Sequence, residues 1–342
     1  MRIKEIYRGN TAPKDTDLMW IRGNEIFLFT NEGWTPVSGG GSSSAEDHLS
    51  ETSESLIQNK AIYNQYVTEK DITDICSIID PDYERKYYLD KPLTFEILTD
   101  GEIAWTASNN NEVIKTITYS INDGEEISIT SVPGQSVTFE VVAGDVVKFK
   151  GTNSTYGAYG TISSNFQGTT CEFNVCGNIA SLIKGEDFEN VTESDFGSYT
   201  FFKLFYECKI VDAKNLILPN FTVEGIYGSM LSHWRAPSKL VSAPKLPAET
   251  LAYACYMSMF EKNTLLTKAP ELPATTAANM CYSYMFSGCS SLNEVTCMLN
   301  SPTSTTNWLK DVSPTGTFKK AASATWSTGA SGIPSGWTVQ NV

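Results

Sequence analysis

The sequence predicts a multidomain, mainly β chain with short helices: a small N-terminal β module, a helical neck, a β-sandwich and a repeat solenoid, in that order. Three observations lead to this prediction. A Gly/Ser tract follows the first apolar runs, alternating apolar and polar residues fill the middle, and a repeat of 26 residues occupies the second half. A chain of 342 residues has room for two or three domains, because typical domains contain roughly 100 to 150 residues.

Residues 1–38 are predicted to form the small β module, a β-meander that ends in Trp34 and Pro36. Two apolar runs, 3–7 and 18–29, are separated by polar residues, and a turn signal at 22–24 divides the second run. Because strands this short bury little surface, we expect the module to dock on another surface. The alternative is a frayed N-terminal arm. Residues 39–44 are only Gly and Ser, a composition that predicts a flexible linker.

Residues 45–90 are strongly acidic and are predicted to form a helical neck. Leu56, Tyr63 and Val67 recur at spacings of seven and four residues, which is typical of one apolar stripe on a helix. A lone helix of this kind is marginal in water unless its stripe meets a partner. The stripe therefore indicates either self-association of several chains or packing on the chain's own β-domain.

Residues 91–175 are predicted to form an immunoglobulin-like β-sandwich. In IKTITYSIN, Ile117, Tyr119 and Ile121 alternate with polar residues, and the following Asp123-Gly124 is a signal for a tight hairpin turn. Further alternating segments follow at intervals of about 8 to 12 residues, as in many sandwiches.

Residues 176–342 contain a repeat. The segment APKLPAETLAYACYMSMFEKNTLL, which begins at Ala243, returns 26 residues later as APELPATTAANMCYSYMFSGCSSL. Recurrent apolar residues with a period of about 20 to 29 residues are typical of a solenoid whose stacked repeats share one core. The expected core anchors are Phe205, Leu231, Phe260 and Phe286, spaced by 26, 29 and 26 residues.

The N-terminal segments resemble known phage proteins. LSETSESLIQNKAIYNQYV, residues 49–67, resembles a Ser-Glu-x-Pro-Val-Gln-Asn-Lys motif in tail-fibre and appendage proteins of tailed bacteriophages, where it often precedes a trimeric region. It departs from that motif at Leu56, where proline is common. IYRGNTAPKDTDLMWI and EGWTPV are similar to N-terminal modules of structural proteins in phages of gut Bacteroidetes, including crAss-like phages.

These resemblances imply a homo-oligomer, most simply a trimer, that docks on other virion proteins through residues 1–68. The residues expected at the contact between chains are Leu56, Gln58, Asn59, Tyr63 and Val67.

The second half resembles BspA-type leucine-rich repeats of Bacteroidetes surface proteins and their phages, through YMFSGCSSL at 284–292. AGDVVKFKG and GNIASLI resemble the module that often precedes such repeats, and GTFKKAASATWSTGASGIPSGWTV resembles their terminal cap. By this resemblance, Cys208, Asn263 and Cys289 are expected where such repeats place Cys or Asn to satisfy the carbonyls of turns.

Charge and motifs argue against several functions. With 25 basic and 39 acidic residues the formal charge is −14, which disfavours nucleic-acid binding. The start, MRIKEIYRGN, predicts no secretory signal, and no apolar run predicts a membrane span. Two histidines and no recognisable catalytic motif predict a protein without enzymatic activity, cofactor or metal.

Eight cysteines are too few for a disulfide scaffold in a chain of this length. Cys255 and Cys281 occupy equivalent repeat positions, so stacked repeats bring their Cα atoms to ~5 Å, within disulfide range. The absence of a secretory signal favours a buried column of free thiols, and a disulfide is the alternative.

Exposed aromatic residues are the candidate ligand contacts, because aromatic rings stack on sugars. The candidates are Tyr156 and Tyr159 in a Gly-rich loop, Trp234 and Arg235 in the longer repeat, and Trp308 after the last repeat. The alternative is that these side chains anchor loops or cap the solenoid.

Together these observations predict a non-enzymatic virion structural protein, a head or tail fibre that presents its outward domains to a host-surface glycan or protein. A bacterial surface adhesin with the same repeats is the main alternative. A glycan-cleaving enzyme is the third hypothesis, and it requires a carboxylate pair in an aromatic groove.

Overall fold

The computed structural model describes the backbone of four strands at 5–8, 18–22, 25–30 and 33–36, and residues 87–107, 114–157, 163–235 and 237–342. The chain divides into two compact units, Met1–Glu84 and Arg85–Val342. The described residues are mainly β, with several sheets and one short α-helix. The predicted β class is therefore confirmed at this level.

The described part of the first unit is a four-stranded sheet in the order β1-β2-β3-β4. Its strands are β1 (Glu5–Arg8), β2 (Leu18–Arg22), β3 (Glu25–Thr30) and β4 (Gly33–Pro36). Strands β2, β3 and β4 pair antiparallel as a meander, as predicted. Strand β1 pairs parallel to β2, which the meander prediction missed because a parallel pair needs a crossover connection between its strands.

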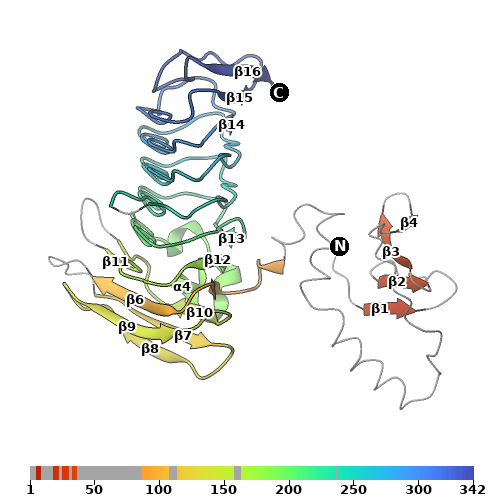
Figure 1. Ribbon diagram of the computed structural model, residues 1–342, viewed down its shortest axis with the longest axis vertical. Helices are drawn as coiled ribbons and strands as arrows, with labels where there is room; N and C mark the ends of the chain where they lie inside the picture. Colours follow the sequence, from red (N-terminus) through yellow and green to blue (C-terminus); the bar gives the residue numbers. More distant parts are fainter. Residues whose placement is uncertain are drawn as a thin grey trace. The chain divides into compact units, whose positions relative to one another are not determined.

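The second unit begins with two sheets (Figure 1). One has six strands in the order β13-β12-β5-β10-β7-β8, and the other has three in the order β11-β6-β9. The first sheet contains β5 (Leu93–Ile97), β7 (Thr116–Ile121), β8 (Ile127–Thr130), β10 (Val146–Gly151), β12 (Phe173–Asn178) and β13 (Leu216–Ile217). The second contains β6 (Gly101–Ala107), β9 (Ser136–Val141) and β11 (Ser164–Asn165). The predicted boundary at residue 175 falls inside β12, so the six-stranded sheet takes strands from both sides of it.

Aromatic side chains join the two sheets. The ring of Tyr119 on β7 stacks on that of Phe139 on β9 with centroids 3.8 Å apart. The ring centroid of Phe166, which follows β11, lies 4.9 Å from those of both Phe95 and Trp105. The alternation predicted for β7 agrees with its burial, because Ile117 and Tyr119 are 1% and 8% exposed.

The hairpin turn between β7 and β8 lies one residue earlier than predicted. Asn122 and Asp123 have φ of 52° and 57°, and the N–H of Gly124 donates to the Ile121 carbonyl at 2.9 Å. Two successive residues with positive φ are the signature of a type I′ turn, which Asn and Asp tolerate. The central pair is therefore Asn122-Asp123, with Gly124 closing the turn.

A short helical segment leads from the sheets to the repeats. It contains α4 (Ser181–Lys184) and the 3-10 helices η1 (Gly185–Asn190) and η2 (Glu193–Asp195). The Ser181 hydroxyl donates to the Phe149 carbonyl and accepts the Leu93 N–H, both within 2.9 Å. These two bonds attach α4 to β10 and β5.

Residues 199–311 form a series of turn segments that we call the turn stack; Figure 1 shows its turns one above another between the sheets and the C-terminal end. The segments are 199–208, 225–234, 254–263, 280–289 and 303–311. In the third segment every fourth residue has positive φ, at Ala254, Ser258 and Lys262 with 52°, 55° and 62°, and the first and fourth segments show the same pattern. This conformation costs about 1 to 2 kcal/mol for each residue that is not Gly, so other interactions must offset it.

Hydrogen bonds between segments provide that offset. The N–H groups of Tyr256, Ser258 and Phe260 donate to carbonyls of the next segment at 2.9–3.1 Å. The intervening N–H of Met259 donates within its own segment, to the Tyr256 carbonyl at 3.1 Å. This alternation satisfies backbone groups that the buried face of the segment would otherwise leave unpaired.

Equivalent residues of successive segments form buried columns. Phe260 and Phe286 stack at 5.5 Å, and both are fully buried, as the repeat predicted for the core. A second column is a ladder of seven rings with neighbouring centroids 5.4–6.4 Å apart. Its members are Tyr156, Phe201, Tyr227, Tyr256, Tyr282, Trp308 and Trp326.

A three-stranded parallel sheet closes the C-terminal end (Figure 1). It contains β14 (Glu294–Thr296), β15 (Gly316–Lys320) and β16 (Trp337–Asn341). The hydrophobic core is continuous from the sheets to this end, and includes both Leu93 and Trp337. Among the described residues, no helix has the length and apolar character that crossing a membrane requires.

Candidate functional site

The residues expected at the contact between chains, Leu56, Gln58, Asn59, Tyr63 and Val67, lie outside the described residues, as does Tyr159. The oligomerisation hypothesis therefore stays a prediction. Of the candidate glycan contacts, Tyr156, Trp234, Arg235 and Trp308 are described.

Two of these candidates are corrected by burial. Tyr156 and Trp308 are 0% exposed and belong to the aromatic ladder. The Tyr156 hydroxyl donates to the Leu182 carbonyl, and the Trp308 indole N–H donates to the Gly332 carbonyl at 2.9 Å. Because neither ring has a free face, neither can stack on a ligand; both have the structural role that was the stated alternative.

Trp234 and Arg235 are exposed, and the irregular repeat length explains why. Trp234 occupies the position equivalent to Cys208, Asn263 and Cys289, but the spacing to Asn263 is 29 residues instead of 26. The regular residues face inward: the Cys289 thiol donates to the Phe260 carbonyl at 3.0 Å and the Asn263 amide to the Leu231 carbonyl at 2.8 Å. This confirms their expected role, whereas Trp234 turns outward and is 52% exposed.

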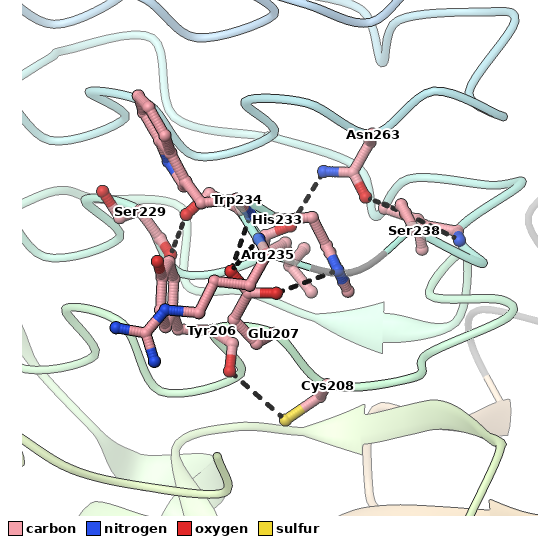
Figure 2. Close-up of polar contacts among 12 residues, drawn as sticks. Tyr206, Glu207, Cys208, Ser229, His233, Trp234, Arg235, Ser238 and Asn263 are labelled. Carbon is pink, nitrogen blue, oxygen red and sulfur yellow. Dashed lines mark hydrogen bonds and ion pairs between the residues drawn. The ribbon is translucent and has the colours of Figure 1, made fainter. Parts of the chain in front are cut away.

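Glu207 holds the backbone of this irregular segment. One of its carboxylate oxygens accepts the N–H groups of Trp234 and Arg235 at 2.6 and 2.8 Å. Its other oxygen lies 3.8 Å from Nδ1 of His233, and the side chains of Glu207 and His233 are 8% and 4% exposed. Figure 2 shows this buried pair with the indole of Trp234 extending away from it. The Glu207 carboxylate therefore holds the backbone of Trp234 and Arg235, whose side chains face outward.

Lys262 fixes the orientation of the exposed ring. Its ammonium group lies 3.8 Å from the centroid of the Trp234 ring, a cation–π contact worth about 0.5 to 1 kcal/mol at an exposed site. It also places a positive charge beside an aromatic surface. Trp234 comes from the second turn segment and Lys262 from the third, so the contact bridges neighbouring segments.

The first turn segment adds a second cation and a second ring. The Lys203 ammonium lies 5.2 Å from the centroid of the Tyr206 ring. Burial, and then the nearby Arg235 guanidinium, hold the pKa of Lys203 below its ordinary value. Burial and then the Glu207 carboxylate raise the pKa of Tyr206. We call Lys203, Tyr206, Trp234, Arg235 and Lys262 the stack patch.

The stack patch offers binding chemistry: an aromatic surface and three cations. Among the described residues, no group of three or more His, Cys, Asp or Glu side chains is placed to hold a metal ion. The buried Glu207 carboxylate next to the stack patch already accepts hydrogen bonds from two backbone N–H groups. The arrangement therefore suits stacking and charge pairing with a ligand.

Sequence reasoning found Trp234 and Arg235 but missed Lys203, Tyr206 and Lys262. The repeat itself carried the signal for Lys262, because it precedes Asn263, the residue equivalent to Trp234 in the next segment. Lys203 and Tyr206 had no comparable signal, since their approach to Arg235 depends on the path of the longer repeat.

The thiols of Cys255 and Cys281 are both free and buried in the structure. The Cys281 thiol donates to the Ala278 carbonyl at 2.8 Å. Burial raises the pKa of Cys255 well above its ordinary value. These side chains lie inside the turn stack and form no part of the stack patch.

No protein-family model, no curated protein and no solved structure matches this chain.

Proposed function

We propose that this chain is a non-enzymatic virion structural protein, a head or tail fibre that attaches to a saccharide of the host surface through the stack patch. The observation that carries this proposal is the exposed Trp234 ring, which contacts the Lys262 ammonium and whose backbone N–H donates to the Glu207 carboxylate. A large exposed aromatic residue on a backbone held in this way is suited to stacking on a sugar ring.

The architecture fits an outward-facing attachment domain. We interpret the sheets of residues 91–175 as an immunoglobulin-like sandwich and residues 176–342 as a BspA-type leucine-rich-repeat solenoid with a terminal cap. This interpretation is supported by the backbone hydrogen bonds between turn segments that are separated by 26 and 29 residues, and by the small sheet at the C-terminal end. A stack of this kind holds side chains of neighbouring turns in fixed register, which a multi-residue binding surface requires.

The N-terminal part is proposed to assemble and dock the fibre. Met1–Glu84 forms a compact unit of its own, and its sequence resembles the phage modules described above. We propose that residues 1–38 dock on other virion proteins, that residues 39–44 form a flexible linker, and that residues 45–90 form a trimeric neck. A bacterial surface adhesin with the same stack patch is the second candidate, and it does not require the trimeric neck.

Light scattering on a sizing column separates these candidates. We expect the full chain to have the mass of a trimer and the segment Arg85–Val342 to have the mass of a monomer. A full-length monomer would contradict the fibre proposal and favour the adhesin. A trimer of the shorter segment would place assembly in the second unit instead of the neck.

A further inference from the structure

We infer that the ligand of the stack patch is an anionic saccharide, one that carries carboxylate or sulfate groups, rather than a neutral one. This inference rests on the proposed function, because it names the class of saccharide that the same surface takes.

Three cations belong to the stack patch. Arg235 is the next residue after Trp234, the Lys262 ammonium lies 3.8 Å from the centroid of its ring, and Lys203 is close enough to Arg235 for mutual repulsion. None of the three forms an ion pair within the described part of the chain. Other surface lysines are paired, for example Lys268 and Lys319 with Glu294. Within the described residues, the patch therefore gathers three like charges that form no ion pair.

The carboxylates nearest to these cations are turned inward. Glu207 is bound to backbone N–H groups of Trp234 and Arg235, and Glu261 is 6% exposed. Burial raises the pKa of Glu261 above its ordinary value. A ligand at the surface consequently meets the aromatic rings and cations first, with the acidic groups behind them.

The dimensions of the patch suit a short oligosaccharide. Lys203, Trp234 and Lys262 belong to three successive turn segments, and a spacing of about 4.8 Å between hydrogen-bonded strands gives a span of roughly 10 Å, comparable with a disaccharide. One ring can stack on the indole while acidic groups on it or its neighbour meet the flanking cations. Arg adds two parallel donors that match the oxygens of a carboxylate or sulfate.

The net charge of the whole chain is opposite in sign to the charge of the stack patch. With a formal charge of −14, the protein repels anions at long range, so attraction has to come from local, unpaired cations. The acidic excess lies mainly in residues 45–175, and residues 176–342 are nearly balanced. The stack patch thus lies in a part of the chain that is close to neutral overall.

The test uses the full chain and two pairs of probes. The first pair is tetragalacturonate and its methyl ester, and the second is a sulfated galactose tetrasaccharide and its desulfated form. Binding is measured by calorimetry for the wild type, for the triple variant Lys203→Met, Arg235→Met, Lys262→Met, and for the charge-retaining triple variant Lys203→Arg, Arg235→Lys, Lys262→Arg. Lys310→Met, an exposed cation in the fifth turn segment, is the matched control.

We expect at least one acidic probe to bind more tightly than its neutral counterpart, and the pair that does so identifies carboxylate or sulfate as the source. The methionine triple variant should weaken that binding by about tenfold, while the charge-retaining variant and Lys310→Met should stay close to wild type. Acidic and neutral forms that bind equally well, with loss only in Trp234→Ala, would overturn the anionic class but leave the proposed function intact. Binding of none of the four probes would overturn both.

Discussion

The second and third turn segments are built from equivalent residues, yet they use them differently. In the third segment, Asn263 turns inward and caps two carbonyls, those of Leu231 and Phe260. In the second, the equivalent Trp234 turns outward, and the Glu207 carboxylate secures the backbone instead. The comparison indicates that a regular repeat stabilises the stack, whereas the longer one turns side chains outward, where we propose that they meet a ligand. Changes in the regular segment should cost stability, and changes in the longer one should cost binding.

The largest effect is expected from Phe260→Ala in the regular segment. Phe260 is fully buried and stacks on Phe286 at 5.5 Å, so its truncation leaves a cavity in the shared core. We expect the free energy of unfolding to fall by about 3 to 5 kcal/mol, measured by denaturant titration. Phe260→Leu is the control and should cost less than about 1.5 kcal/mol; equal losses would mean that packing at this position is loose.

Alanine substitutions at two glycines distinguish the cost of backbone strain from the cost of a steric clash. Gly225 and Gly288 have φ of 61° and 76°, so alanine is strained at both. A Cβ at Gly225 would lie 2.1 Å from the Tyr199 ring, whereas at Gly288 it would lie 3.0 Å from the flexible Lys262 side chain.

We therefore expect Gly288→Ala to lower the unfolding free energy by about 1 kcal/mol and Gly225→Ala to lower it by about 1 to 3 kcal/mol more. Thermal unfolding followed by circular dichroism measures both variants. The reverse order would show that the second segment is the looser one.

Asn263 tests the inward capping position. Asn263→Ala removes the donor to the Leu231 carbonyl at 2.8 Å and leaves this buried acceptor without its bond, so we expect a loss of about 2 kcal/mol. Asn263→Cys should lose less, because the thiol of the equivalent Cys289 reaches the corresponding carbonyl of Phe260 at 3.0 Å. The comparison by chemical denaturation fails if alanine and cysteine are equally destabilising.

The smallest effect is expected from removing a hydroxyl in the aromatic ladder. Within the described residues, the buried hydroxyl of Tyr256 has no hydrogen-bond partner, whereas that of Tyr156 donates to the Leu182 carbonyl. Tyr256→Phe should therefore leave the unfolding free energy unchanged or slightly higher, and Tyr156→Phe should lower it by about 1 kcal/mol. A clear loss in Tyr256→Phe would indicate a bound water that satisfies its hydroxyl.

The sequence predicted the regular parts well, because their signals are local or periodic. Alternation located β7 and the repeat located the Phe260–Phe286 column, since each pattern directly reflects which side chains are buried. The parallel pairing of β1 with β2 depends on chain crossing, and no residue pattern records it. Tyr156 and Trp308 were misplaced because exposed stacking residues and ladder residues have the same composition. The irregular repeat length was the one local sign of the stack patch.

The role proposed for the longer repeat is tested by Trp234→Ala in the full chain, with binding measured on a printed library of oligosaccharides and stability measured by unfolding. We predict that binding is lost while the unfolding free energy stays within about 1 kcal/mol of wild type. Tyr253→Ala, at another exposed aromatic residue of the stack (38% exposed), should retain binding. Wild-type binding that survives Trp234→Ala, or a large loss of stability in that variant, would contradict the claim that the longer repeat exists to present a ligand-binding surface.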